Sequence, residues 1–162
     1  MIPVDGDSPT VRVVPLASGS AAIPVVAGWL SAQWGREQGH SYEDTLSWCA
    51  EVADSRNEAL VCAFLGELPV GAGLLVECDL PSRDCWRPWL SSLYVPAEHR
   101  GKGIGRALIA GICEAARRGG WPEVYLYAVT GRLTEYYAGF GWRPVERMEF
   151  SGVMFDVMKR TL

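Results

Sequence analysis

The stretch His99-Arg100-Gly101-Lys102-Gly103-Ile104-Gly105-Arg106 carries three glycines at alternate positions among four basic or potentially basic side chains. It follows an apolar run, 89–95, that is typical of a buried strand, and it opens a helical pattern that runs to about Arg118. Glycine reaches positive φ at little cost, so successive N–H groups can turn toward one point at the helix N-terminus, where the helix dipole favours an anion. The stretch therefore predicts a site for a phosphorylated ligand.

The spacing of these glycines excludes two common phosphate motifs. In the dinucleotide fingerprint GxGxxG, the third glycine would fall at Arg106. In the Walker A loop a lysine follows the last glycine and precedes a Ser or Thr, whereas Lys102 stands before Gly103. The alternative is a glycine-rich turn that merely joins a strand to a helix, but the basic side chains that crowd it favour a binding loop.

Length and composition indicate one globular domain. The chain has 162 residues, 49% of them hydrophobic, which is enough to bury a sizeable core. The formal net charge of −4 argues against a nucleic-acid binder that depends on bulk positive charge. No apolar run approaches the roughly 20 residues that span a bilayer, so no membrane partner is expected.

The cysteines and the first residues bear on the cellular compartment. The five cysteines are widely spaced and include no CxxC pair, so neither a disulfide framework nor a zinc site is indicated. The start of the chain lacks the basic region and the apolar core of a signal peptide. We expect a cytoplasmic protein with reduced cysteines and no metal. The mild negative charge suits a cationic partner, but solubility alone also explains it.

The periodicity of the apolar residues predicts a mixed-sheet α/β domain over 10–162, preceded by a loose lead-in at 1–9. It has about seven strands and four helices. The expected strands are 11–16, 59–65, 70–78, 89–95, 124–129, 143–150 and 153–159. The expected helices are 21–34, 42–54, 104–118 and 133–138, the second preceded by a capping-box pattern at Ser41 and Asp44. The strands 89–95 and 124–129 should be parallel because a helix separates them. The final hairpin also offers an edge for a homodimer.

The run 93–108 resembles motif A of the GNAT superfamily, the acyl-CoA-dependent N-acetyltransferases. The core of that motif, Arg/Gln-x-x-Gly-x-Gly/Ala, is met by Arg100, Gly103 and Gly105. The strand before it and the helix after it add to the likeness. The order of the expected elements matches this family across about 10–162.

A second stretch, 134–142, resembles the motif B element of the same family. In that element a tyrosine stands four residues before a Gly-aromatic pair, and Tyr137, Gly141 and Trp142 fill these places. Thr130 stands seven residues before the tyrosine, where many members carry an asparagine that contacts the cofactor.

The resemblance implies acetyl-CoA as the co-substrate and a splay between the strands 89–95 and 124–129 that admits it. The pantetheine arm would lie along the first strand, with one amide near Leu93 donating to the thioester carbonyl. The implied cofactor-binding residues are Leu93, Tyr94, Val95, Arg100, Gly101, Lys102, Gly103, Ile104, Gly105, Arg106 and Thr130.

The implied reaction is direct attack of an amine on the thioester. Tyr137 is the candidate acid that protonates the leaving thiolate, the alternative being a packed aromatic residue, and its neighbour Tyr136 is expected in the core. Because an amine of pKa about 10 arrives protonated, a base is needed, and Glu77 and Asp79 at the end of the strand 70–78 are the candidates. Their alternative is a solvated strand end, and His40 is a third candidate base.

The acceptor is less well specified than the donor. A small-molecule amine is expected, with a peptide or protein amino group as the second choice. The rival is a module that binds the cofactor without catalysis. Aromatic residues before the loop could line the acceptor site or belong to the core, namely Trp34, Tyr42, Trp48, Trp86 and Trp89.

Overall fold

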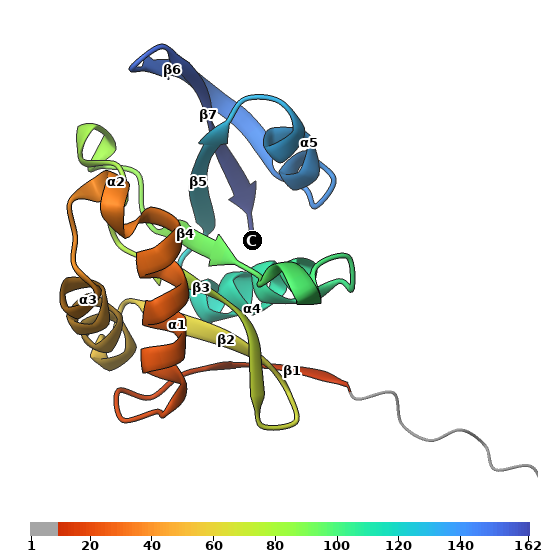
Figure 1. The fold of residues 1–162 in the computed structure, drawn as a ribbon. Helices are drawn as coiled ribbons and strands as arrows, with labels where there is room; N and C mark the ends of the chain where they lie inside the picture. The colour runs from red at the N-terminus through yellow and green to blue at the C-terminus, as the bar shows by residue number, and fades with distance from the viewer. Residues whose placement is uncertain (1–9) are drawn as a thin grey trace, which may run out of the picture.

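A seven-stranded sheet runs through the computed structural model, which describes residues 10–162 (Figure 1). The lead-in predicted at 1–9 lies outside these residues. The strand order is β1-β2-β3-β4-β5-β7-β6, and every neighbouring pair is antiparallel except β4 and β5. The strands are β1 (Val11–Pro15), β2 (Ala59–Leu65), β3 (Leu68–Val76), β4 (Trp89–Tyr94), β5 (Glu123–Val129), β6 (Arg143–Phe150) and β7 (Val153–Thr161). The predicted mixed α/β domain is confirmed.

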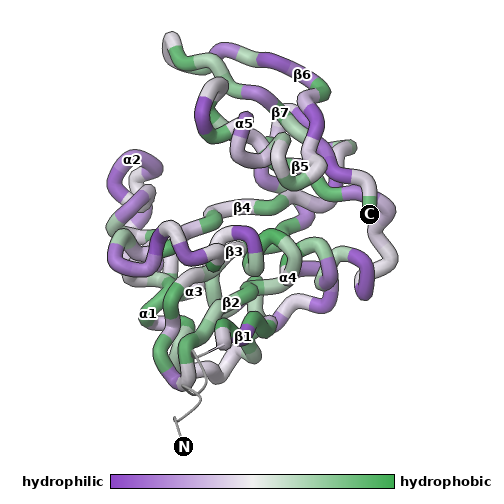
Figure 2. The backbone as a smooth tube through the Cα atoms, turned by 90° about the vertical axis from the view of Figure 1, so that its right-hand side faces the viewer, coloured by the Kyte–Doolittle hydropathy of each residue, from purple (hydrophilic) through white to green (hydrophobic). Residues whose placement is uncertain are grey.

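Helices cover both faces of this sheet. They are α1 (Ala22–Leu30), the short α2 (Arg36–Gln38), α3 (Tyr42–Asp54), α4 (Ile104–Arg118) and α5 (Arg132–Ala138). Buried residues of α1 and α3 pack on one face, which we call the α1–α3 face, and those of α4 and α5 pack on the other, the α4–α5 face. Strands covered on both faces read as continuous apolar runs, and β2 and β3 are coloured accordingly in Figure 2, whereas β6 carries hydrophilic stretches.

The first helix is less regular than predicted. A single helix over 21–34 was expected, but α1 passes into a π-helical segment, Ser31–Gly35, before α2. The α3 helix begins as predicted, because the Asp44 N–H donates to Ser41 Oγ over 3.1 Å and the Ser41 N–H donates to Asp44 Oδ2 over 2.9 Å. Strand β3 ends at Val76, short of the predicted end at residue 78.

The parallel strands β4 and β5 pair only where they begin. Their register contains one pair, Trp89 with Tyr125, and the Tyr125 N–H donates to the Pro88 carbonyl over 2.9 Å. Beyond this point the strands diverge, as Figure 1 shows. Ser92 in β4 has a φ of 54°, and the register of β3 against β4 shifts at the same place, which marks a bulge. The expected splay is therefore present.

Two further predictions concern surfaces. None of the helices in residues 10–162 is long and apolar enough to cross a membrane. Strand β6 forms one edge of the sheet. Pairing of that edge with a second copy stays a prediction.

Candidate active site

The glycine-rich loop has the backbone that its sequence predicts. A 3-10 turn, Ala97–His99, leads into Gly101 with a φ of 75° and Gly103 with a φ of 81°. A Cβ at either glycine would meet no other heavy atom within 4 Å, so the loop backbone is open on these sides. Gly103 is the N-cap of α4 and no side chain caps the helix. Its first N–H groups are therefore available to an anion.

Two of the basic side chains shape this loop as well as charge it. The Arg100 Nε donates to the Val95 carbonyl over 2.8 Å, and the guanidinium lies 5.8 Å from the ring centre of Tyr94. Arg106 lies 5.8 Å from the ring centre of Phe140, in the turn after α5. Arg100 thus ties the loop to the end of β4, whereas Lys102 is exposed.

A cavity of about 360 Å³ joins the end of β4, the glycine loop and α5. Its lining residues are Leu93, Val95, His99, Arg100, Gly101, Ile104, Gly105, Leu133 and Tyr136. Most of the predicted cofactor-binding residues from β4 and the loop therefore meet at one place. Tyr94 is an exception, because its side chain lies on the α1–α3 face, 6.0 Å from Trp29 and 6.2 Å from Trp34 between ring centres.

Two residues of this cavity were not predicted as site residues, namely Leu133 and Tyr136, whereas His99 belongs to the predicted glycine-rich stretch. Tyr136 corrects an expectation, because it is 41% exposed rather than part of the core. Its hydroxyl lies so close to α4 that a Cβ added at Gly105 would be 2.7 Å away. The spacing of Leu133 and Tyr136, three residues apart, was the available signal, because such residues share one face of a helix.

One buried polar atom at the loop has no hydrogen-bond partner among residues 10–162, namely Nδ1 of His99. Because buried polar groups are rarely left unpaired, this atom fits a bound ligand that supplies the missing partner. Thr130, the predicted cofactor contact just after β5, does not line the cavity. Its N–H donates to the Met154 carbonyl over 2.9 Å, and its hydroxyl adds to the effect of Arg147 in lowering the pKa of Asp156.

Tyr137 is buried, whereas the adjacent Tyr136 is exposed. Its side chain is 6% exposed and packs edge-on against Tyr136 and Trp142, at 5.4 and 6.1 Å between ring centres. Burial raises the pKa of its hydroxyl, so the group keeps its proton at neutral pH. The ring is thus packed, as the alternative interpretation held, while the protonated hydroxyl is the form that an acid requires.

Asp79 lies on the α1–α3 face, where the splay begins. Its Oδ1 accepts a hydrogen bond from Ser91 Oγ over 3.1 Å. Ser91 stands two residues after Trp89 in β4, and Tyr127 stands two residues after Tyr125 in β5. Because Trp89 and Tyr125 are paired, Ser91 and Tyr127 lie on the same face of the two diverging strands. Burial raises the pKa of Asp79 to about 6, against the hydrogen bond from Ser91. Burial also raises the pKa of Tyr127 to about 12, with a contribution from the charge of Asp79.

The other two candidate bases lie apart from this point. The Glu77 N–H donates to Glu58 Oε2 over 3.0 Å, and strand alternation gives Glu77 the face of Leu75, opposite to that of Ser91. His40 is exposed in the loop between α2 and α3. The structure therefore brings Asp79 to the splay and not Glu77 or His40.

The loop 77–88, which contains Asp79, lies over the sheet. Within it Trp86 stacks on Tyr125 at 5.3 Å between ring centres, and Arg83 forms a hydrogen-bonded ion pair with Glu146 of β6. Trp89 is fully buried and belongs to the core. The Tyr42 hydroxyl donates to the Pro24 carbonyl over 3.4 Å.

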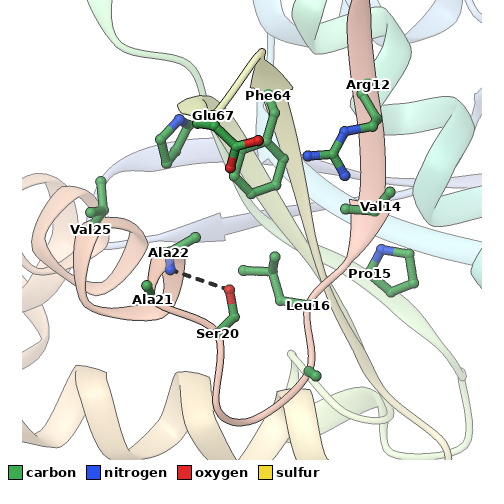
Figure 3. Close-up of a pocket in the computed structure, with 12 residues that line it drawn as sticks. Arg12, Val14, Pro15, Leu16, Ser20, Ala21, Ala22, Val25, Phe64 and Glu67 are labelled. Carbon is green, nitrogen blue, oxygen red and sulfur yellow. Dashed lines mark hydrogen bonds between the residues drawn. The ribbon is translucent and has the colours of Figure 1, made fainter.

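A second cavity of about 580 Å³ lies between β1, the β2–β3 turn and the start of α1 (Figure 3). Arg12 lies over the ring of Phe64, with 4.8 Å from the guanidinium carbon to the ring centre. None of the predicted site residues lines it. Among residues 10–162, no group of three or more His, Cys, Asp or Glu side chains is placed to hold a metal ion.

The comparisons with known proteins agree with this geometry. The model of the family described as Acetyltransferase (GNAT) family matches residues 23–142. A search of curated proteins found no match.

Solved structures share the fold at low sequence identity. yncA from Salmonella typhimurium, solved with its cofactor acetyl-CoA, has a TM-score of 0.75 at 14% identity, with 93% of each chain covered. An aminoglycoside 6'-N-acetyltransferase complexed with coenzyme A has a TM-score of 0.73 at 14% identity, over 93% of this chain and 96% of that one. The paia N-acetyltransferase of Thermoplasma acidophilum, also with coenzyme A, has a TM-score of 0.69 at 16% identity, over 94% and 99%.

Proposed function

Because the chain belongs to the GNAT family of acetyltransferases, we propose that it transfers the acetyl group of acetyl-CoA to the primary amine of a small molecule by direct attack. The observation that carries the proposal is the meeting of the glycine loop, the end of β4 and α5 around one cavity at the splay. Two of the similar structures were solved with coenzyme A and one with acetyl-CoA, which supports the choice of donor.

The donor is bound by groups that the fold leaves open. The N–H groups of 101–106 receive the pyrophosphate, and Arg100, Lys102 and Arg106 add positive charge beside it. The pantetheine arm enters the cavity between β4 and α5, where Leu93 and Val95 line one side and Leu133 and Tyr136 the other. The bulge at Ser92 turns an amide near Leu93 toward the thioester carbonyl, where it stabilises the oxyanion of the tetrahedral intermediate.

Asp79 and Tyr137 carry the proton transfers. Asp79 is largely ionised at neutral pH because its pKa is about 6, so it can accept the proton that the ammonium group must lose. The amine nitrogen then forms its bond to the carbonyl carbon and releases its surplus proton to solvent, and collapse of the intermediate breaks the carbon–sulfur bond. Tyr137 donates its proton to the leaving thiolate and is reprotonated from solvent. No covalent enzyme intermediate is required.

Binding and turnover test the two halves of the proposal separately. Acetyl-CoA and CoA at about 100 times their Kd should stabilise the protein by about 3 kcal/mol, which corresponds to a Tm rise of roughly 5–10 °C for a chain of this size. Absence of a shift with both ligands would overturn the donor assignment. A shift without thiol release across a broad panel of amines and peptides would favour the rival, a module that binds CoA without catalysis.

A further inference from the structure

Aromatic side chains flank both sides of the splay on the α1–α3 face. On the β4 side, Trp29 and Trp34 pack against Tyr94, at 6.0 and 6.2 Å between ring centres. On the β5 side, Tyr127 packs edge-on against Phe155 of β7 at 6.1 Å. Trp29, Trp34 and Tyr94 are only partly buried, and Tyr127 is 37% exposed, so these rings offer apolar surface to a ligand.

The position of Trp34 depends on an irregularity of the helix. Trp34 lies in the π-helical segment Ser31–Gly35, in which the wider turn changes the direction of the side chains that follow α1. Gly35 is buried there, and a Cβ added to it would be 3.1 Å from the His40 carbonyl oxygen. The chain therefore packs tightly behind Trp34, which holds the indole toward Tyr94.

The α1–α3 face also carries a negative charge at the splay. Asp79 lies at the start of the splay, and among residues 10–162 its carboxylate has a hydrogen bond only from Ser91. The carboxylate of Glu146, on β6, is already paired with Arg83. One half-buried carboxylate, with one oxygen outside the hydrogen bond from Ser91, thus stands at the start of the splay that these aromatic side chains flank.

We propose that the acceptor is an arylalkylamine, a primary amine joined by a short chain to an aromatic ring. This inference rests on the proposed function and names the substrate class of that same site. The amine nitrogen lies at Asp79, and the ring of the substrate packs against Trp34 and Tyr94 on one side or Tyr127 on the other. Offset or edge-on ring pairs strengthen binding beyond the burial of their surface.

The same surface disfavours more polar amines. A polyamine or an aminoglycoside would place further ammonium or hydroxyl groups against ring carbons, away from any second free carboxylate at the splay. Each polar group that loses water without gaining a partner weakens binding of the substrate. A peptide amino group carries unpaired backbone amides to the same place and meets the same cost.

The wild-type acceptor profile is the decisive experiment. Thiol release is measured with 2-phenylethylamine and tryptamine against spermidine, kanamycin, a tripeptide and n-propylamine. We expect kcat/KM for the two arylalkylamines to exceed that for every other amine by at least about tenfold, the equivalent of one ring contact. Higher kcat/KM for spermidine, kanamycin, the tripeptide or n-propylamine overturns the inference.

A pair of variants tests the aromatic wall. Trp34→Ala should raise KM for 2-phenylethylamine by about tenfold and change kcat/KM for n-propylamine by less than about threefold, and Trp34→Phe should restore most of the loss. Phe150→Ala, which removes a side chain that is 74% exposed at the β6–β7 turn, is the matched control and should change neither value. Equal losses for both amines in Trp34→Ala would contradict a contact with the substrate ring.

The two proposals fail in distinguishable ways. If acetyl-CoA and CoA produce no Tm shift, the proposed function itself is wrong and the acceptor class falls with it. If they stabilise the protein and another amine class is acetylated faster, the proposed function stands and only the arylalkylamine inference is overturned. The wild-type panel decides this even if a Trp34 variant does not fold.

Discussion

The hydroxyl of Ser91 donates a hydrogen bond to Oδ1 of Asp79 over 3.1 Å, which joins the middle of β4 to the loop that precedes it. This contact holds the carboxylate at the point where β4 and β5 separate. It also makes Asp79 a test of the proposed mechanism, because the same group is costly to the fold and is the proposed proton acceptor.

Asp79→Asn should lower activity without lowering stability. The folded pKa of about 6 lies above the ordinary value of 3.8, so the contribution of Asp79 to the free energy of unfolding is most favourable below pH 4 and falls as pH rises to 6. Above pH 6 the native state carries the full penalty, on the order of 1–3 kcal/mol, which the amide removes. We expect kcat at pH 7.5 to fall on the order of 100-fold, with an unchanged or higher Tm. An unchanged kcat, or a lower Tm, would exclude this role.

Ser91→Ala should move the pH profile rather than abolish activity. The hydrogen bond from Ser91 lowers the pKa of Asp79 against the effect of burial, so its removal raises that pKa further above 6. The acidic limb of kcat/KM should shift to higher pH, while the rate at pH 9 stays close to that of the wild type. Ser92→Ala, which removes a hydroxyl 3.2 Å from Ser91 Oγ but not bonded to Asp79, should leave the limb in place.

Tyr137→Phe should separate catalysis from binding. The ring packing against Trp142 is kept and only the hydroxyl is lost, so the Kd for CoA should change by less than about threefold. If Tyr137 is the acid, kcat should fall on the order of 100-fold. Tyr125→Phe, whose hydroxyl donates to Glu123 over 2.6 Å, removes a phenol elsewhere and serves as the control. Equal kcat values in the two variants would leave Tyr137 as a packed aromatic residue.

Gly105→Ala should harm donor binding and not the fold. Alanine stabilises a helix interior by about 1 kcal/mol relative to glycine, but its Cβ would lie 2.7 Å from the Tyr136 hydroxyl, which must move into the cavity. We expect KM for acetyl-CoA to rise by about tenfold while the free energy of unfolding stays equal or increases. Gly103→Ala should instead lower the free energy of unfolding, because a residue with a side chain at the φ of 81° is strained by about 1–2 kcal/mol. A stability loss in Gly105→Ala would contradict the assignment.

Arg100→Lys should behave almost as Arg100→Ala. Lysine keeps the charge but cannot reproduce the bond from Nε to the Val95 carbonyl that ties the loop to β4. A hydrogen bond from a charged group contributes about 1.5–3 kcal/mol, so KM for acetyl-CoA should rise by about tenfold in both variants. Lys102→Arg preserves charge at an exposed position and should leave KM unchanged. If Arg100→Lys matches the wild type, charge alone explains the residue.

Local sequence signals predicted those parts of the protein that depend on neighbouring residues. The positive φ angles of Gly101 and Gly103 were expected because alternate glycines precede a helix, and the Ser41 capping box was read from two residues. Tyr136 was misplaced because motif spacing does not tell which side of α5 faces the core. Adjacent helical residues differ in direction by about 100°, so Tyr136 and Tyr137 point to different sides of α5.

Contacts between distant segments could not be predicted. Asp79 was read as a strand-end carboxylate, but its burial arises because the loop after β3 folds over the sheet, with Arg83 reaching Glu146 on β6. The π-helical segment that positions Trp34 likewise depends on how α1 packs and leaves no periodic signal. The proposed acceptor side of the site is built from such contacts, which is why the sequence alone could not assign aromatic residues such as Trp34 to the acceptor or to the core.

The left-handed backbone of Ser92 has a consequence for engineering. A non-glycine residue at a φ of 54° within a strand is a costly choice, and glycine there would be the first substitution that stability-guided redesign selects. Such a change would also make the bulge more flexible, and in the proposed mechanism this bulge directs an amide near Leu93 toward the thioester. A redesign scored only on thermal tolerance would thus accept a mutation that we expect to lower the turnover rate. Position 92 should therefore be held constant in any library built on this chain.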